Sequence, residues 1–169
     1  MSIKLAAAAA SAALIAGSAA AQTSPQTITA ELRNSAGQAV GGVTLTDAPK
    51  GVLLRLDVKG LSAGWHGMHF HEKGDCSTSD FSSAGGHNHG AEARVHGLLN
   101  AKANETGDLP NLYAGADGAG AAEVFTTVTT LKALRDADGS ALVIHANPDD
   151  HTAQPIGGAG TRVACAVIK

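Results

Sequence analysis

The sequence has little of several features that mark large classes of protein. No apolar run reaches the roughly 20 residues that a membrane-spanning helix needs. Lys and Arg number 12 against 15 Asp and Glu, so the chain lacks the basic excess of nucleic-acid-binding domains. It has no internal repeat, and its one helix-like stretch, residues 131–138, is too short for a helical layer. These absences argue against a membrane-spanning protein, a nucleic-acid-binding protein and a helical fold.

The first residues have the pattern of a secretory signal peptide. Lys4 precedes an alanine-rich apolar run that ends on small residues at Ala21. A core helix or a membrane anchor is the alternative, but the run is short and the residues after it are polar. We therefore expect residues 1–21 to be cleaved near Ala21, residues 22–169 to form one domain, and the mature protein to be periplasmic or secreted.

Cysteine is scarce, with only Cys76 and Cys165 in the chain. In an oxidising compartment an even number of cysteines favours a disulfide. Such a bond would close a long loop, worth about 4 to 5 kcal/mol in the chain-entropy model. A pair of free buried thiols is the alternative, which export makes less favourable.

Short windows of alternating apolar and polar residues predict strands rather than helices. The alternation is clearest over residues 28–33 and 52–59, and it recurs over 124–128 and 163–167. Many short strands separated by glycines indicate an all-β sandwich or barrel.

Two long segments, residues 73–117 and 147–160, have the pattern of neither strand nor helix. Structureless loops beyond about 12 to 15 residues are uncommon in compact domains and are usually functional or disordered. Because the first segment holds a dense set of possible metal ligands, we expect it to be functional.

The clearest chemical signal is the pair His69 and His71. On a strand, this spacing places both imidazoles on one face and Met68 and Phe70 on the other. Their Cα atoms would lie about 6.6 to 6.8 Å apart, so both rings can reach one ion. Alternating polar residues on a solvated strand would give the same pattern, so the pair alone does not establish a site.

More candidate ligands follow at intervals along the chain: His87, His89, His96, Asp108 and His145. Imidazole nitrogen suits copper and zinc, and a carboxylate in the cluster suits zinc better than copper. These residues predict a metal site, but residue types alone leave the metal and the number of ions open.

Six sequence blocks, in this order, resemble the copper,zinc superoxide dismutases, and in particular their bacterial secreted branch. They are Gly67–Glu72, Gly74–Cys76, Ser83–His87, Gly107–Asn111, Leu142–Ala146 and Gly160–Cys165. The resemblance covers nearly all of the expected mature chain. It implies an all-β, Greek-key sandwich or barrel with two long functional loops.

The resemblance also implies a site. Copper would be held by His69, His71, His87 and His145, and zinc by His87, His96, Asp108 and one further residue. Asp149 would hydrogen-bond one histidine of each metal, Arg162 would stand at the copper entrance, and Cys76 would pair with Cys165.

This sequence departs from the family pattern at the remaining zinc position, where Glu105 replaces a histidine. A glutamate oxygen is also a zinc ligand, so a His, His, Glu, Asp site is chemically reasonable. His89 is a second departure, which we interpret as a solvated loop residue. His66 resembles a structural histidine of the family, and we expect His151 to be exposed.

The function implied is an enzyme that converts superoxide to dioxygen and hydrogen peroxide by redox cycling of copper, with His87 carrying a proton. The alternative is a noncatalytic periplasmic copper or zinc binding module on the same fold. That alternative predicts that a copper ligand or Arg162 is missing. The sequence contains all four copper-type histidines and Arg162. The resemblance allows a monomer or a homodimer.

Overall fold

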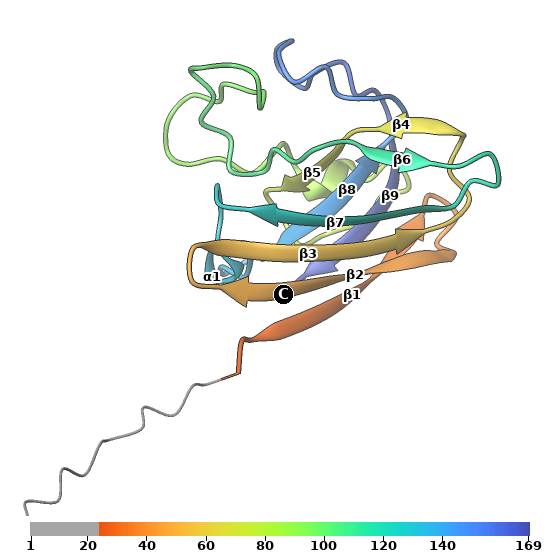
Figure 1. The fold of residues 1–169 in the computed structure, drawn as a ribbon, viewed down its shortest axis with the longest axis horizontal. Coiled ribbons are helices and arrows are strands. Elements are labelled where there is room, and N and C mark those ends of the chain that lie inside the picture. Colours follow the sequence, from red (N-terminus) through yellow and green to blue (C-terminus); the bar gives the residue numbers. More distant parts are fainter. Residues whose placement is uncertain (1–23) are drawn as a thin grey trace, which may run out of the picture.

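The computed structural model of this chain describes residues 24–169, which fold almost entirely into β-strands (Figure 1). The strands are β1 (Thr27–Asn34), β2 (Ala39–Ala48), β3 (Gly51–Val58), β4 (Gly64–His66), β5 (Met68–His71), β6 (Leu112–Ala114), β7 (Gly120–Thr126), β8 (Ser140–His145) and β9 (Arg162–Ile168). Helical structure in the described residues is limited to a 3₁₀ turn, Ser82–Ala84, and the short helix α1 (Leu131–Leu134).

These strands form one antiparallel sheet in the order β4-β6-β7-β3-β2-β1-β9-β8-β5, curled into a nearly closed barrel. Hairpins join β1, β2 and β3, whereas β3 pairs with β7 and β1 with β9 across long connections, as in Greek-key folds. The two edge strands, β4 and β5, are separated only by Gly67. Gly67 donates its N–H to the carbonyl of Asn147 and accepts from the N–H of His145, which continues the pairing of β5 with β8. The predicted all-β class is therefore confirmed.

The barrel core follows from the alternation along each strand. On β3, Leu54 and Leu56 point inward and are buried, while Arg55 and Asp57 between and after them are exposed. Side chains from the other strands complete one apolar cluster, including Leu32, Leu45, Met68, Phe70, Leu142, Ile144 and Ile168. The core therefore fixes β5 and β8, the two strands that carry histidines of the expected site.

Strand β8 is buried along its whole length because both of its faces are covered. Leu142 and Ile144 face the barrel core, whereas Ala141 and Val143 pack with Phe81 in a second apolar cluster outside it. A disulfide between Cys76 and Cys165, whose Cα atoms lie 6.0 Å apart, belongs to this second cluster. The predicted pairing of the two cysteines is confirmed, and it fastens the loop after β5 to β9.

Two sequence predictions need correction. The segment 73–117 is interrupted by β6 and by the 3₁₀ turn, both only three residues long and too short to show a period. The window 124–128 ends early, because β7 stops at Thr126 and Val128 is exposed.

The strand windows did not include β2, in which Gly41 and Gly42 interrupt the alternation. Gly41 lies so close to the neighbouring strand that a Cβ there would fall 1.9 Å from the carbonyl oxygen of Asp57. The glycine that hides the strand from pattern analysis is therefore one that the strand pairing requires.

The two long loops meet above the barrel, beyond β4 and β6 in Figure 1. The N–H of Leu99 donates to the carbonyl of His151 at 3.1 Å, and the N–H of His96 donates to the Gln154 side chain at 2.9 Å. The expected signal peptide, residues 1–21, lies outside the described residues. Among residues 24–169, no helix is long and apolar enough to cross a bilayer.

Candidate metal centre

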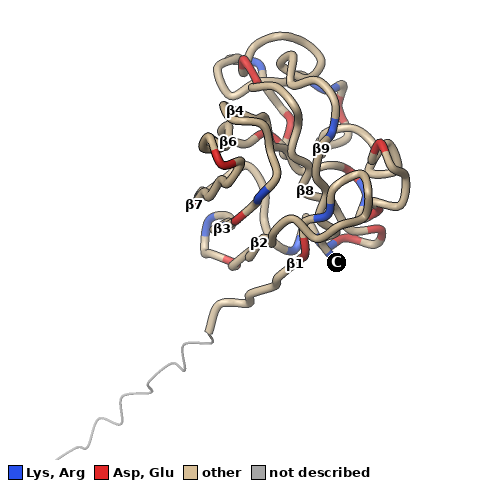
Figure 2. The backbone as a smooth tube through the Cα atoms, turned by 90° about the vertical axis from the view of Figure 1, so that its right-hand side faces the viewer, with Lys and Arg blue, Asp and Glu red and all other residues tan. Residues whose placement is uncertain are grey.

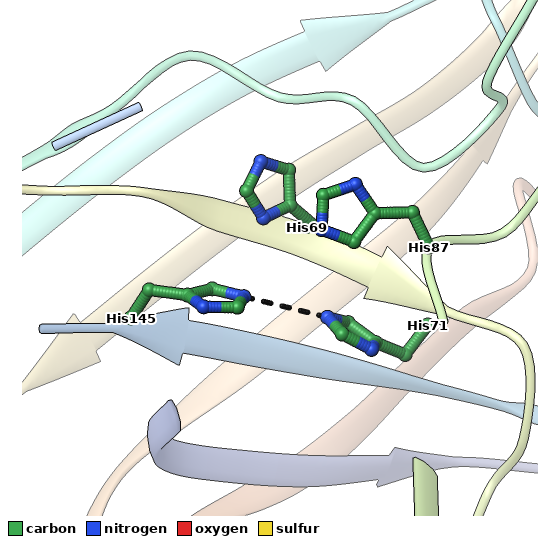
Figure 3. Close-up of side chains that lie close together, drawn as sticks. All are labelled: His69, His71, His87 and His145. Atoms are coloured by element: carbon green, nitrogen blue, oxygen red, sulfur yellow. Dashed lines mark hydrogen bonds between the residues drawn. The ribbon is translucent and has the colours of Figure 1, made fainter. Parts of the chain in front are cut away.

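Four histidines from three parts of the chain converge beside β5 and β8, on the side of these strands that faces away from the barrel core (Figure 3). His69 and His71 come from β5, His145 ends β8, and His87 lies in the loop after the 3₁₀ turn. All four are buried, and one nitrogen from each lies within 4.8 Å of the others. Isolated bridges between His71 and His87 and between His69 and Asp108 hold the loops against β5.

The outward nitrogen of each of these histidines has a partner. His71 and His145 donate from Nδ1 to the carbonyl oxygens of Gly85 and Gly160, each at 3.1 Å. The Nε2 of His69 lies 2.7 Å from a carboxylate oxygen of Asp149. In a neutral imidazole, donation from one nitrogen leaves a lone pair on the other. These contacts therefore turn the lone pairs toward a common point.

The inward nitrogens lack ordinary partners. His69 Nδ1 and His87 Nε2 are buried with no hydrogen-bond partner, and the Nε2 atoms of His71 and His145 face each other at 3.4 Å (Figure 3). Buried polar groups without a partner are rare and call for an explanation. Four convergent imidazole lone pairs fit a copper ion, whose preferred ligands include imidazole.

Burial also sets the charge state of this group. It lowers the pKa of His69 to about 4, against the opposing hydrogen bond to Asp149. It lowers the pKa of His71 to about 2 and that of His145 to about 4. The three rings are therefore neutral at pH 7, which is the form that binds a metal.

A second group of possible ligands adjoins the first and shares His69 and His87 with it. His69, His87, His96 and Asp108 each offer one atom within 4.8 Å of the others. In addition, Glu105 Oε2 lies 2.8 Å from His87 Nδ1 and 2.9 Å from His96 Nδ1. Asp108 Oδ1 lies 2.9 Å from the same nitrogen of His96 and has no hydrogen-bond partner.

This second group is electrostatically suited to a cation. Burial opposes a charge on His96, but the adjacent carboxylates of Asp108, Asp149 and Glu105 outweigh it and raise the pKa to about 11. Burial likewise favours a neutral Glu105, yet its contacts with His87 and His96 hold its pKa well below the usual range. Two imidazoles and two carboxylates around one point fit zinc.

Asp149 joins the two groups. One of its oxygens contacts His69 Nε2 at 2.7 Å and the other contacts His96 Nε2 at 3.1 Å. Asp149 is itself held by Asn111, whose side chain accepts from the Asp149 N–H at 2.9 Å and donates to the Asp149 carbonyl at 2.8 Å. Sequence reasoning did not single out Asn111, although it follows the Gly-Asp-Leu-Pro run directly.

A cavity of about 240 Å³ opens onto the histidines. His71, His87 and His145 line it together with Arg94 and Arg162. Arg162 is held by backbone carbonyls, because it donates to the oxygens of Phe81 and Gly85. Arg162 thus lines the cavity beside the histidines, and so does Arg94, which the sequence analysis did not identify.

The remaining histidines lie outside both groups. His66 contacts the carbonyl oxygens of His145 and Ser62 at 2.7 and 2.8 Å, which ties two backbone segments together. The side chain of His89 lies 3.1 Å from Glu72, and His89 meets the zinc-type group through its backbone, at an isolated bridge with Glu105. The expectation that His151 is exposed was wrong: its side chain is 19% exposed, because Asn111 and Asp149 pack against it.

Comparison with known proteins points to one family. The family model for copper/zinc superoxide dismutase matches residues 39–168. A Cu-Zn superoxide dismutase of Caulobacter vibrioides is 60% identical over 147 residues, which cover 83% of this chain and 84% of that protein.

Solved structures give the same result. A crystal structure of a double mutant of a superoxide dismutase-like protein from Bacillus subtilis has a TM-score of 0.79 and 36% identity, covering 83% of this chain and 95% of that one. The Cu/Zn superoxide dismutase of Brucella abortus has a TM-score of 0.72 and 29% identity, covering 85% and 100%.

Proposed function

This chain belongs to the copper/zinc superoxide dismutase family, and from that premise we propose that its histidine cluster converts two superoxide ions and two protons to dioxygen and hydrogen peroxide. The observation that carries the proposal is the complete set of four buried histidines with inward nitrogens, beside a cavity lined by Arg162. A noncatalytic copper or zinc module would need neither the open cavity nor the arginine.

The two halves of the site have different ligands. His69 Nδ1 and the Nε2 atoms of His71, His87 and His145 would hold copper, which supplies the one-electron redox couple of the reaction. His87 Nδ1, His96 Nδ1, Asp108 and Glu105 would hold zinc. The protein contributes the fixed directions of these atoms, because each copper-type ring is oriented through its other nitrogen.

His87 and Arg162 act on the substrate. His87 lines the cavity, and its Nε2 has no hydrogen-bond partner, so when this atom is not bound to copper it can hold one of the two protons that peroxide formation consumes. Arg162 presents a fixed guanidinium to a small anion at the same cavity, where it attracts superoxide and donates hydrogen bonds to it.

The test of this function is superoxide consumption by the copper-loaded and zinc-loaded mature protein, together with metal analysis. Arg162→Glu should lower kcat/KM by about tenfold or more while copper content stays unchanged, because steering contributes 10- to 1000-fold to such rates. A wild-type protein that binds copper but does not consume superoxide would leave the noncatalytic module as the function.

Glu105 is the residue on which the zinc half depends. Glu105→Gln keeps the side-chain size but removes the charge, so zinc retention should fall while copper retention persists. Glu105→His should raise zinc retention if the loop presents an imidazole as it presents the carboxylate. Unchanged zinc content in both variants, measured by atomic emission after dialysis, would remove Glu105 from the ligand set.

Export is part of the same proposal. A signal peptide over residues 1–21 would deliver the chain to the periplasm, and the disulfide between Cys76 and Cys165 is typical of oxidising compartments. N-terminal sequencing of the protein from a periplasmic fraction tests cleavage near Ala21. Sedimentation of that mature protein tests for a homodimer.

A further inference from the structure

The cavity at the copper-type histidines is lined by two guanidinium groups, and only that of Arg162 has a role so far. We propose that Arg94 is a second steering residue for the anionic substrate, presented to the cavity as the positive end of an ion pair with Glu72. The proposal rests on the function proposed above and adds a residue from the zinc-bearing loop to it.

Arg94 reaches the cavity by lying across Gly86, the residue before His87. A Cβ at position 86 would fall 1.7 Å from Arg94 Nη1 and 2.9 Å from the central carbon of the guanidinium. Only glycine leaves room for the group there. The neighbouring Gly85 offers its carbonyl to both Arg162, at 2.6 Å, and His71, at 3.1 Å. Arg162 thus contacts Gly85, and Arg94 lies against the adjacent Gly86.

Glu72 holds Arg94 in this place. Its Oε1 lies 3.4 Å from Arg94 Nη1 and 3.1 Å from His89 Nε2, and its Oε2 accepts from the N–H of Gly86 at 3.0 Å. Because Glu72 directly follows His71 at the end of β5, the carboxylate is fixed to the strand that carries two of the histidines. His89 is not placed as a metal ligand, and its contact with Glu72 gives it a role in positioning that carboxylate.

The direction of the ion pair decides its effect on an anion. Arg94 is among the residues that line the cavity, and Glu72 is not. The one acid in the lining, Glu105, is buried and bound to His87 and His96. A superoxide ion in the cavity therefore meets the cation first, with the carboxylate behind it. Arg162 is held by neutral carbonyls instead, so its charge is not offset by a bonded acid. Steering by Arg94 is accordingly the weaker of the two.

Local charge is needed because the whole chain repels an anion. Its formal net charge at pH 7 is −3. Figure 2 shows Lys and Arg positions interspersed with Asp and Glu along the described backbone rather than gathered on one side. Attraction of superoxide then depends on which charges face the cavity, and fields of this kind are focused by low-dielectric walls.

This arrangement predicts that neutralising Arg94 and neutralising Glu72 change the attraction of an anion in opposite directions. Arg94→Gln removes the cation that faces the cavity and should weaken anion attraction. Glu72→Gln removes the carboxylate behind it, retains an oxygen for the N–H of Gly86, and should strengthen anion attraction. Arg94→Lys keeps the charge and should stay close to wild type. Lys132→Gln, an exposed change in α1, is the charge-matched control for Arg94→Gln.

The experiment measures two quantities on copper-loaded and zinc-loaded protein of confirmed metal content. One is kcat/KM for superoxide by stopped flow at ionic strengths of about 0.01 M and about 1 M, where the Debye length falls from about 30 Å to about 3 Å. The other is the Kd of azide, an anionic probe, from the visible spectrum of the Cu(II) protein.

At low ionic strength Arg94→Gln should lower kcat/KM about threefold and raise the azide Kd about as much, with both effects lost at high ionic strength. Arg94→Gln behaving like Lys132→Gln in both measurements would overturn the proposal, as would Arg94→Lys losing as much as Arg94→Gln. If the wild type does not consume superoxide, the proposed function fails, and the azide series alone then decides the place of Arg94.

Discussion

The two halves of the metal centre share His87 and adjoin each other, yet they are built in opposite ways. The copper half takes His69, His71 and His145 from strands whose other faces pack in the core, and its rings are neutral. The zinc half takes His96, Glu105 and Asp108 from a loop, and carboxylates hold a positive charge on its histidine. One half is positioned by the barrel, and the other by charges within the loop.

This difference indicates how each half depends on its metal. Barrel strands and backbone carbonyls orient the copper-type rings. The zinc-type group concentrates negative charge that needs a cation, and either zinc or a proton on His96 supplies it. We therefore expect the copper half to be preformed and the zinc half to depend on what it binds.

The largest effect should come from His145→Ala, which removes a copper-half ligand and leaves the loop ligands intact. Removing even an outer partner of a ligand costs 10- to 100-fold in metal affinity, so the loss of copper affinity should exceed about a hundredfold. Copper and zinc contents are measured by atomic emission. Zinc should be retained, and His89→Ala should retain both metals. Loss of zinc together with copper would show that the halves are not separately built.

The disulfide supports the copper half, because the loop that it fastens carries Gly85, which orients His71 and Arg162. Replacing both cysteines with serine should lower the free energy of unfolding by about 2 to 5 kcal/mol, since a native disulfide in a small secreted domain is worth that much. Urea unfolding of the metal-free protein measures it. Faster copper release with unchanged zinc release would place the effect in the copper half, and the reverse would contradict it.

Asp149 contacts a histidine of each half, so its replacement compares how strongly the zinc half and the copper half depend on it. Asp149→Asn retains only one carbonyl oxygen for two imidazole N–H groups, so zinc affinity should fall about 10- to 100-fold. Copper affinity should fall less, because two of its other rings are oriented by backbone carbonyls. Competition titrations with a chromophoric chelator measure both, with Asp57→Asn on the exposed face of β3 as the control. Equal losses for the two metals would mean that Asp149 orients both halves alike.

The smallest effect is a difference in proton release. In the metal-free protein the pKa of His96 is raised to about 11, so this ring is protonated at pH 7 and must lose about one proton to bind zinc. Apparent zinc affinity should therefore fall as the pH falls. His69, His71 and His145 have lowered pKa values and give up no proton to copper at pH 7. Calorimetry in buffers of different ionisation enthalpy counts these protons, and equal release for both metals would contradict the contrast.

Most of the barrel was predictable because strand alternation is a local pattern. The windows at 28–33, 52–59 and 163–167 fall on β1, β3 and β9. Short or glycine-interrupted strands such as β6 and β2 gave no such pattern, since their position is set by pairing with neighbours. The signal peptide and the metal-binding roles of individual residues stay predictions.

The sequence by itself determined the all-β class, the His69 and His71 pair on one strand face, and the family, because spacing along a strand and ordered blocks need no long-range contact. Tertiary structure alone decided which nitrogen of each histidine faces inward, that Asp149 joins His69 to His96 from 80 and 53 residues away, and that Arg94 crosses Gly86 into the cavity. These depend on where two loops meet above a closed barrel, and that meeting is fixed by strand register and packing rather than by any local pattern.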